Sequence, residues 1–188
     1  MKEIKPKECV VCGEEFIPSR TTQKVCGWSC AIPLGRTNME KQNRKAWNKE
    51  KKIIKDKQKT HKDWLKDLEK VVNEFIRLRD KGKPCISCGS VNYTMSAGHY
   101  FPAGSYGNVR FDEDNIHGQC WFNCNSSKHG NLAEYTLRLP ERIGKERFEQ
   151  LQVRAKQTTL KLSIPEIKEK IEYYRGKIRE MKAKPVEK

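Results

Sequence analysis

Apolar side chains recur at helical intervals between about residue 38 and residue 82, and no proline or glycine interrupts this stretch before Gly82. The pattern predicts one long amphipathic helix, whose apolar positions include Trp64, Leu65, Leu68, Val71, Val72, Phe75 and Ile76. Residues 40 to 84 hold sixteen Lys or Arg and eight Asp or Glu, and the first half of the helix is the richest in lysine. That half, which contains Lys45 and Lys52, either is solvated or lies along nucleic-acid phosphates.

Residues 83 to 131 follow a different pattern, with glycines, aromatics, four cysteines and three of the four histidines in one short stretch. Residues 93–101 and 108–118 favour β-structure and flank the turn-rich segment 102–107, which predicts a loose hairpin. A short helix is expected to begin near the Cys120 and Cys124 pair and to end at Gly130.

The C-terminal part again has helical periodicity. Asn131 with Glu134 forms a capping-box pattern before a helix that is expected to end at Pro140. Ser163 with Glu166 forms a second such pattern, before a final helix with Ile167, Ile171, Tyr174, Ile178 and Met181 on one face. These helices are expected to be structural.

The chain therefore has an α+β pattern in four parts. We predict a small zinc ribbon in residues 1–36, because Phe16 and Trp28 are its only aromatic residues and a metal must form its core. A lysine-rich helical arm in residues 37–82 comes next, followed by a module that carries the chemistry in residues 83–131 and C-terminal helices in residues 132–188.

The formal charge of +15 and an isoelectric point near 9.5 narrow the choice of partner. Such a charge attracts polyanions, so DNA is the first partner to consider. No apolar run approaches the roughly 20 residues of a membrane-spanning helix, and no signal peptide opens the chain. We expect an intracellular protein with no membrane partner.

The eight cysteines form two quartets with the spacing of structural zinc sites. Four thiolates from two short loops complete a closed tetrahedral zinc site, and disulfides are not expected without export to an oxidising compartment. The first quartet is Cys9, Cys12, Cys26 and Cys30, and the second is Cys85, Cys88, Cys120 and Cys124. The sequence predicts one structural Zn²⁺ in each quartet.

Three side chains between residues 99 and 129 suit phosphodiester hydrolysis. His99, at the end of the first predicted strand, is a candidate general base, because an imidazole titrates near neutral pH. Asn125 and His129 are four residues apart and would share one helical face, where they could hold Mg²⁺ or Mn²⁺. A packed histidine, a capping asparagine and a surface histidine are the alternatives without function.

These motifs resemble a known family. Two cysteine loops around a Gly-His strand, then Asn-Ile, then Cys-x3-Cys-Asn-x2-Lys, are similar to the zinc-stapled HNH (ββα-metal, treble-clef-like) endonucleases, a branch that includes the phage resolvase endonuclease VII. The ribbon, the lysine-rich helix and the catalytic stretch together resemble the NinG (Rap) recombination proteins of lambdoid phages. The resemblance implies a structure-specific endonuclease that acts on branched intermediates such as D-loops and Holliday junctions.

The resemblance also implies roles for individual residues. His99 would activate water, Asn125 and His129 would ligate the catalytic metal, and Asn115 would orient the hairpin. Many HNH enzymes have an acidic or histidine ligand just before the base, whereas this chain has Gly98. Either water replaces that ligand, or a neighbour supplies it; the candidates are Asp112, Asp114 and His117, of which His117 is taken as a catalytic-site residue.

Lys128 and Arg110 are candidate phosphate contacts, like Lys45 and Lys52. The aromatics Tyr100, Phe101, Tyr106 and Trp121 either stack on unpaired bases or belong to the core. The rival to an endonuclease is a non-catalytic zinc-dependent DNA-binding adaptor, which Gly98 favours, while no recognition-helix pattern supports a transcription regulator. Branched DNA, recombination proteins and a second copy of the chain are the expected partners, in the cytoplasm of the phage's bacterial host.

Overall fold

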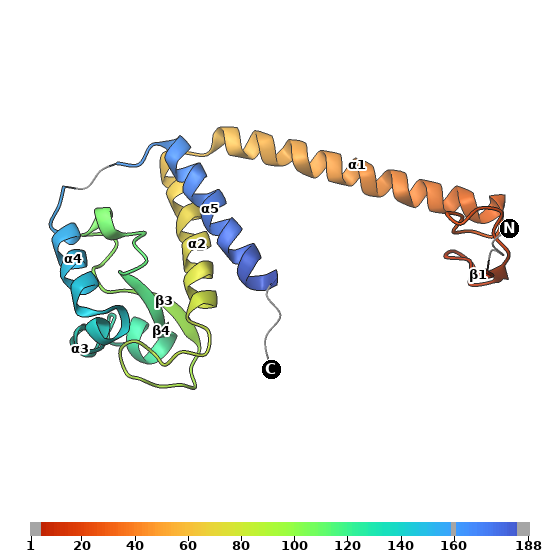
Figure 1. The fold of residues 1–188 in the computed structure, drawn as a ribbon. Helices are drawn as coiled ribbons and strands as arrows, with labels where there is room; N and C mark the ends of the chain where they lie inside the picture. Colours follow the sequence, from red (N-terminus) through yellow and green to blue (C-terminus); the bar gives the residue numbers. More distant parts are fainter. Residues whose placement is uncertain (1–4, 159–160, 184–188) are drawn as a thin grey trace. The chain divides into compact units, whose positions relative to one another are not determined.

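The computed structural model describes residues 5–158 and 161–183, and these form a mixed α+β protein of mostly helical content. The chain divides into two compact units, Met1–Lys59 and Thr60–Lys188 (Figure 1). No helix among the described residues is long and apolar enough to cross a bilayer.

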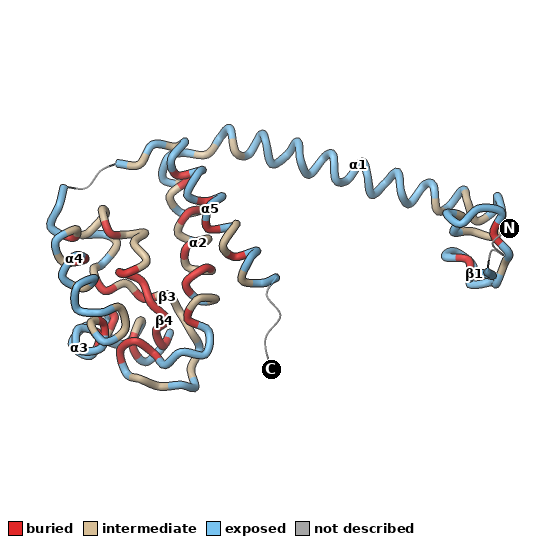
Figure 2. Tube along the Cα trace, in the orientation of Figure 1, coloured by how far each residue is buried: buried red, intermediate tan, exposed pale blue. Residues whose placement is uncertain are grey.

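The first unit is built without an apolar core. Strand β1 (Lys7–Glu8) pairs antiparallel with β2 (Glu15–Phe16), and helix α1 (Trp28–Gln58) follows. Among residues 5–59 only Cys9 and Pro18 are buried, and α1 has no buried residue: its trace in Figure 2 is pale blue and tan, without red. Apolar burial therefore contributes little to this unit, in keeping with a metal-centred fold.

The predicted single helix over residues 38–82 is wrong, because the structure has two helices there. Helix α1 begins earlier, at Trp28, and ends at Gln58, and α2 spans His61–Arg79. Thr60 lies between them in an extended conformation and forms a capping box with Asp63: each side chain accepts a hydrogen bond from the other residue's backbone N–H. This cap starts a new helix and separates the exposed lysine-rich segment from the packed one.

The second unit has a β-hairpin between two pairs of helices (Figure 1). Helix α2 packs on α5 (Ile164–Ala183) through a buried cluster that also takes in Ile116 of the hairpin. The opposite side holds α3 (Leu132–Ile143) and α4 (Lys145–Ala155), whose core includes Tyr135 and Leu151. The hairpin is therefore covered on both faces.

The hairpin strands are β3 (Met95–His99) and β4 (Ile116–Cys120), which pair antiparallel with His99 opposite Ile116 and Gly98 opposite His117. Both are shorter than predicted, and residues 108–115 are not a strand but a 3₁₀ turn, η1 (Gly107–Val109), followed by further turns. The cause is Asn115, whose buried amide donates to the carbonyl oxygens of Phe101 and Val109 and so holds the loop backbone in place of a strand partner.

The predicted helix after the hairpin is only a π-helical turn, η2 (Trp121–Ser126). The predicted cap at Asn131 is also wrong: Asn131 has φ of 45°, makes no capping bond, and donates its amide N–H to the sulfur of Cys124. Helix α3 continues through Pro140 to Ile143, and α4 follows without having been predicted. The capping box of Ser163 and Glu166 is confirmed at the start of α5.

Asp80 joins the end of α2 to the hairpin. Its carboxylate is 1% exposed and accepts hydrogen bonds from Arg79, from Lys83 and from the backbone N–H of Gly118 in β4. Burial alone would raise the pKa of Asp80, but these donors hold it well below its ordinary value of 3.8. The ionised carboxylate therefore stabilises the unit fully at pH values above about 4, and this contribution is lost as the pH falls through the depressed folded-state pKa.

We expect Asp80→Asn to lower the free energy of unfolding of the second unit at pH 7 by about 3 kcal/mol, because Arg79 then keeps a buried charge without its carboxylate. Denaturant unfolding of the zinc-loaded chain measures this change. Glu141→Gln, which removes an exposed carboxylate of α3, is the control and should change stability by less than about 0.5 kcal/mol. Equal stability of the two variants would contradict the assigned role of Asp80.

Candidate functional site: two cysteine quartets and a histidine hairpin

The structure brings each cysteine quartet together. The four sulfur atoms of Cys9, Cys12, Cys26 and Cys30 all lie within 4.8 Å of one another, and so do those of Cys85, Cys88, Cys120 and Cys124. Sulfur pairs are separated by 3.6 and 3.7 Å in the first quartet and by 3.5 and 4.0 Å in the second. Four sulfurs at Zn–S bonds of about 2.3 Å stand roughly 3.8 Å apart in a tetrahedron, so both quartets can hold a zinc ion.

The two quartets share a local geometry. In each, a Cys-x2-Cys loop closes on a glycine with positive φ, Gly13 or Gly89, whose N–H donates to the carbonyl oxygen of the first cysteine. Backbone N–H groups also reach the sulfurs, and those of Cys12, Val11 and Cys26, with Cys12 first, lower the pKa of Cys9 to about 6. Such bonds favour the thiolate form that a metal requires.

His99 is oriented by the loop between the strands. Its Nε2 lies 2.9 Å from the carbonyl oxygen of Arg110, which can only accept, so Nε2 carries the proton and Nδ1 keeps its lone pair. Burial of the ring lowers the pKa of His99 below 6.5, so the imidazole is neutral at pH 7. The residue predicted as a base is thus held in the tautomer and charge state that a base needs.

Asn115 fixes the loop that orients His99. Its side-chain oxygen accepts from the N–H of Phe101 at 2.7 Å, while its amide donates to the carbonyl oxygens of Phe101 and Val109. These bonds join the ends of both strands to Val109, the residue before Arg110. Asn115 therefore joins the two strand ends through its side chain; its predicted functional role stays a prediction.

His117 does not join His99. It pairs with Gly98 in the hairpin, so its ring lies on the opposite face from that of His99, and it is 2% exposed. Its Nδ1 donates to the hydroxyl of Tyr135, which in turn donates to the carbonyl oxygen of Gly98. Burial lowers the pKa of His117 to about 3, so this histidine is neutral and structural, and its prediction as a catalytic-site residue is not supported by its placement.

Gly98 leaves room for a neighbour that sequence reasoning missed. A Cβ atom at position 98 would lie 2.2 Å from Oε1 and 3.0 Å from Cβ of Gln119. Gln119 is fully buried, and its Nε2 donates to the hydroxyl of Ser87 and to the carbonyl oxygen of Gly130. Its side chain therefore fills the space where a ligand at position 98 would stand.

Asn125 and His129 are not on one helical face. Helix η2 ends at Ser126, and His129 has φ of 49°, so the predicted four-residue helical spacing does not hold. Asn125 is half-buried and donates from Nδ2 to the hydroxyl of Ser96, on the hairpin face that carries Gly98, whereas His129 is exposed. No local pattern predicts the contact between Asn125 and Ser96, because the two residues are far apart in the chain.

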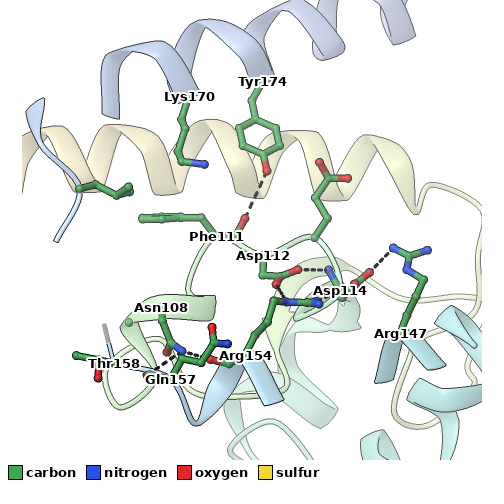
Figure 3. A pocket seen from close by; sticks show the side chains of 13 residues that line it. Asn108, Phe111, Asp112, Asp114, Arg147, Arg154, Gln157, Thr158, Lys170 and Tyr174 are labelled. Atoms are coloured by element: carbon green, nitrogen blue, oxygen red, sulfur yellow. Dashed lines mark hydrogen bonds and ion pairs between the residues drawn. The ribbon is translucent and has the colours of Figure 1, made fainter. Parts of the chain in front are cut away.

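Asp112 and Asp114 are not free to replace the missing ligand. They line a pocket of about 610 Å³ between the loop after η1 and helices α4 and α5, and Figure 3 shows both carboxylates facing arginines. Asp112 pairs with Arg154, and Asp114 pairs with Arg154 and Arg147. Among the described residues, the groups of three or more His, Cys, Asp or Glu side chains close enough together to hold a metal are the two cysteine quartets.

The candidate DNA contacts differ in availability. Lys45 and Lys52 on α1 are exposed, and so is Lys128 after η2. Arg110 is engaged, because its guanidinium lies 2.6 Å from the carboxylate of Glu69, so it does not act as a free phosphate contact. It also lies outside a strand, contrary to the prediction.

The fold and the two quartets define a small α+β protein with two four-cysteine centres, one of which staples a histidine-bearing hairpin. The chain belongs to the NinG family, whose profile, described as "Bacteriophage Lambda NinG protein", matches residues 1–184. The resemblance to NinG proteins seen in the sequence is thereby confirmed.

Individual relatives match most of the chain. Protein ninG of Escherichia phage 933W is 34% identical over 164 residues, which cover 78% of this chain and 80% of that protein. Protein ninG of Salmonella phage P22 is 36% identical over 148 residues, covering 71% and 72%. That of Escherichia phage lambda is 34% identical over 156 residues, covering 75% and 76%. No solved structure matches the chain.

We expect the purified chain to contain two zinc ions, measured by elemental analysis, since each quartet supplies four thiolates. Cys12→Ser and Cys88→Ser should each remove one ion, and only Cys88→Ser should destabilise the second unit. Ser29→Ala, beside Cys30, is the control and should keep both ions. Retention of two zinc ions by either cysteine variant would contradict the assignment.

We expect Gly98→Ala to destabilise the second unit by about 1–3 kcal/mol, because the new methyl group collides with buried Gln119. The loss should be smaller when the same change is made in a Gln119→Ala background, which a double-mutant cycle of denaturant unfolding measures. Gly104→Ala is the control, since no atom lies within 4 Å of a Cβ added there. Additive losses would show that the two positions do not collide.

Proposed function

We propose that the chain is a metal-dependent endonuclease of the HNH type that hydrolyses phosphodiester bonds in branched DNA intermediates of phage recombination, such as D-loops and Holliday junctions. The observation that carries the proposal is the state of His99: a neutral imidazole at the end of β3, with Nε2 bonded to the Arg110 carbonyl and Nδ1 left to take a proton. A general base for water needs this combination near neutral pH.

The residues around His99 support this role. Asn115 acts as a positioning residue, because it holds the loop that carries the Arg110 carbonyl and so sets the direction of the imidazole. The second quartet would hold zinc as a structural ion, since four thiolates leave it no open position for water. In this mechanism Nδ1 of His99 accepts the proton of the attacking water.

A divalent cation, Mg²⁺ or Mn²⁺, is part of the proposal. Asn125 would hold it through Oδ1, since Nδ2 is occupied by Ser96, and exposed His129 is a second candidate ligand. Phosphate oxygens and water commonly complete the coordination of such ions. When bound, the cation would stabilise the negative charge that develops on the phosphate and on the departing oxygen.

The basic surface supports DNA as the substrate. Helix α1 contains nine Lys or Arg and three Asp or Glu, and exposed Lys45 and Lys52 are among the nine. Lysines that contact phosphates release counterions, so affinity for DNA should fall with salt and depend little on sequence. The lysine-rich helix would then supply affinity, and the hairpin would supply the chemistry.

A zinc-dependent DNA-binding adaptor without catalysis is the second candidate. One observation favours it: position 98 has no ligand, and Gln119 fills the space beside it. An adaptor would bind branched DNA and recruit other recombination proteins, but would leave the DNA uncut. Cleavage separates the two functions.

We expect the wild type to cut end-labelled branched DNA with Mg²⁺ or Mn²⁺, and His99→Ala to lose at least about 100-fold in rate with unchanged DNA binding. His61→Ala is the control, since His61 is an exposed histidine of α2 bonded to the Leu162 carbonyl. It should cut at the wild-type rate. Binding without cutting by the wild type would favour the adaptor.

The same reaction should depend on pH in a defined direction. Protonation of His99 removes the base, and burial lowers its pKa from the ordinary 6.5, so the rate should fall toward acid pH with a midpoint below 6.5. Single-turnover rates between pH 5 and 8 measure this. A rate that rises through a midpoint above pH 7 would point to a different base.

A further inference from the structure

Most aromatic side chains of the second unit pack against one another. Tyr100, for example, contacts the rings of Phe101, Tyr135 and Phe148. Trp121 and Phe122 differ, because they are neighbours on η2 and are 55% and 71% exposed. Two adjacent exposed aromatic rings add nothing to the core, and such a patch commonly marks a binding surface.

The backbone beneath these two rings is held firmly. They lie between Cys120 and Cys124 of the second quartet, and the N–H of Trp121 donates to the Thr94 carbonyl at 2.9 Å. The carbonyl oxygen of Phe122 accepts from both the N–H and the hydroxyl of Ser127. The rings are therefore presented from a rigid turn, so little backbone freedom is lost when a ligand binds.

The charge around the rings selects the ligand. Residues 81–111 and 115–133 contain no Asp or Glu, and Lys128 is exposed a few residues after Phe122. The three acids between these stretches are paired: Asp112 with Arg154, Glu113 with Lys177, and Asp114 with Arg147 and Arg154. The surroundings thus favour an anionic ligand with flat apolar faces.

We propose that Trp121 and Phe122 form a stacking surface for unpaired nucleic-acid bases. A single strand combines phosphates, which suit the acid-free surroundings, with exposed base faces, which stack on aromatic side chains. In a duplex those faces are hidden between neighbouring base pairs. The inference rests on the DNA-binding part of the proposed function, and it makes segments with unpaired bases, as found at a branch or gap, the preferred substrate.

Affinities for a fluorescein-labelled 20-mer of thymidine and for a 20-base-pair duplex test the proposal, measured by anisotropy with the zinc-loaded full chain. Without Mg²⁺ or Mn²⁺, cleavage does not interfere. Trp121→Ala should weaken binding of the single strand by about 5- to 150-fold, the range for loss of one stacked base, and change duplex binding by less than about twofold. Phe122→Ala should act in the same direction, and Trp121→Phe should retain most of the affinity.

Trp47→Ala is the matched control, since it removes an exposed tryptophan from α1 and should leave the preference for single strands unchanged. In a Trp28→Phe, Trp47→Phe background, only Trp121 and buried Trp64 emit, and the single strand, but not the duplex, should quench the part of the emission that Trp121→Phe removes. Zinc content and unfolding of each variant confirm its fold, and retained binding by Trp121→Phe separates loss of stacking from loss of structure.

Two sets of outcomes would contradict the proposal that Trp121 and Phe122 stack on unpaired bases. An equal loss for single strand and duplex, or no loss for either, would overturn the stacking surface. A lower molecular mass of Trp121→Ala in light scattering, with unchanged affinities, would assign the two rings to contact with a second copy and would also overturn it.

Failure of the inference and failure of the proposed function are distinguishable. If His99→Ala abolishes cleavage while Trp121→Ala keeps the preference for single strands, the endonuclease stands and the stacking surface falls. If the wild type does not cut but Trp121→Ala loses that preference, the stacking surface stands and the adaptor is favoured.

Discussion

The convergence of four sulfur atoms in the second unit is the constraint on which the rest of that unit depends. Cys85 and Cys88 come from the loop after α2, while Cys120 and Cys124 stand at the end of β4 and in η2. The segment between α2 and β3 contributes only one fully buried aliphatic side chain, Ile86, to the core. Apolar burial contributes little to so polar a loop, and a zinc ion in the second quartet would cross-link it to the hairpin.

The two faces of the hairpin contact very different surroundings. Ile116 lies in the apolar cluster between α2 and α5. The opposite face carries a buried polar network in which Gln119 bonds to Ser87 and to Gly130, while Tyr135 bonds to Gly98. A slip of β4 by one residue in register would turn His117 and Gln119 away from these partners and toward the apolar cluster. The polar network therefore specifies the register, and with it the hairpin face on which the His99 ring lies.

This arrangement explains why some features could be predicted from sequence and others could not. The cysteine quartets and the cap at Ser163 were predictable because each is a local spacing with a single chemical meaning. The helix break at Thr60 is not predicted from sequence, although Thr60 and Asp63 form a capping pattern. The lysine-rich residues before Thr60 have high helical propensity, so they are equally compatible with one continuous helix. Helical propensity alone does not show where packing begins.

The site was harder to predict than the fold, because its geometry depends on contacts between distant segments. Placing Asn125 and His129 on one face assumed an α-helix, but the amide of Asn131 and the sulfur of Cys124 bring the chain into a left-handed turn instead. Gln119 had no sequence signal, since a glutamine in a short strand commonly faces solvent. Here it is buried, because Gly98 on the neighbouring strand has no side chain to exclude it.

A metal centre would also account for the start of α1, a 31-residue helix with no buried side chain. Helix formation is limited by the first turn, which fixes several residues for a single hydrogen bond. Cys30 lies in that first turn and Cys26 just before it, so closing the first quartet around a metal would fix the turn in advance. Propagation then needs only residues of good helical propensity, which lysine, glutamate and glutamine supply without an apolar face. A metal centre can thus sustain a long helix whose lysine and arginine side chains remain exposed to a polyanion.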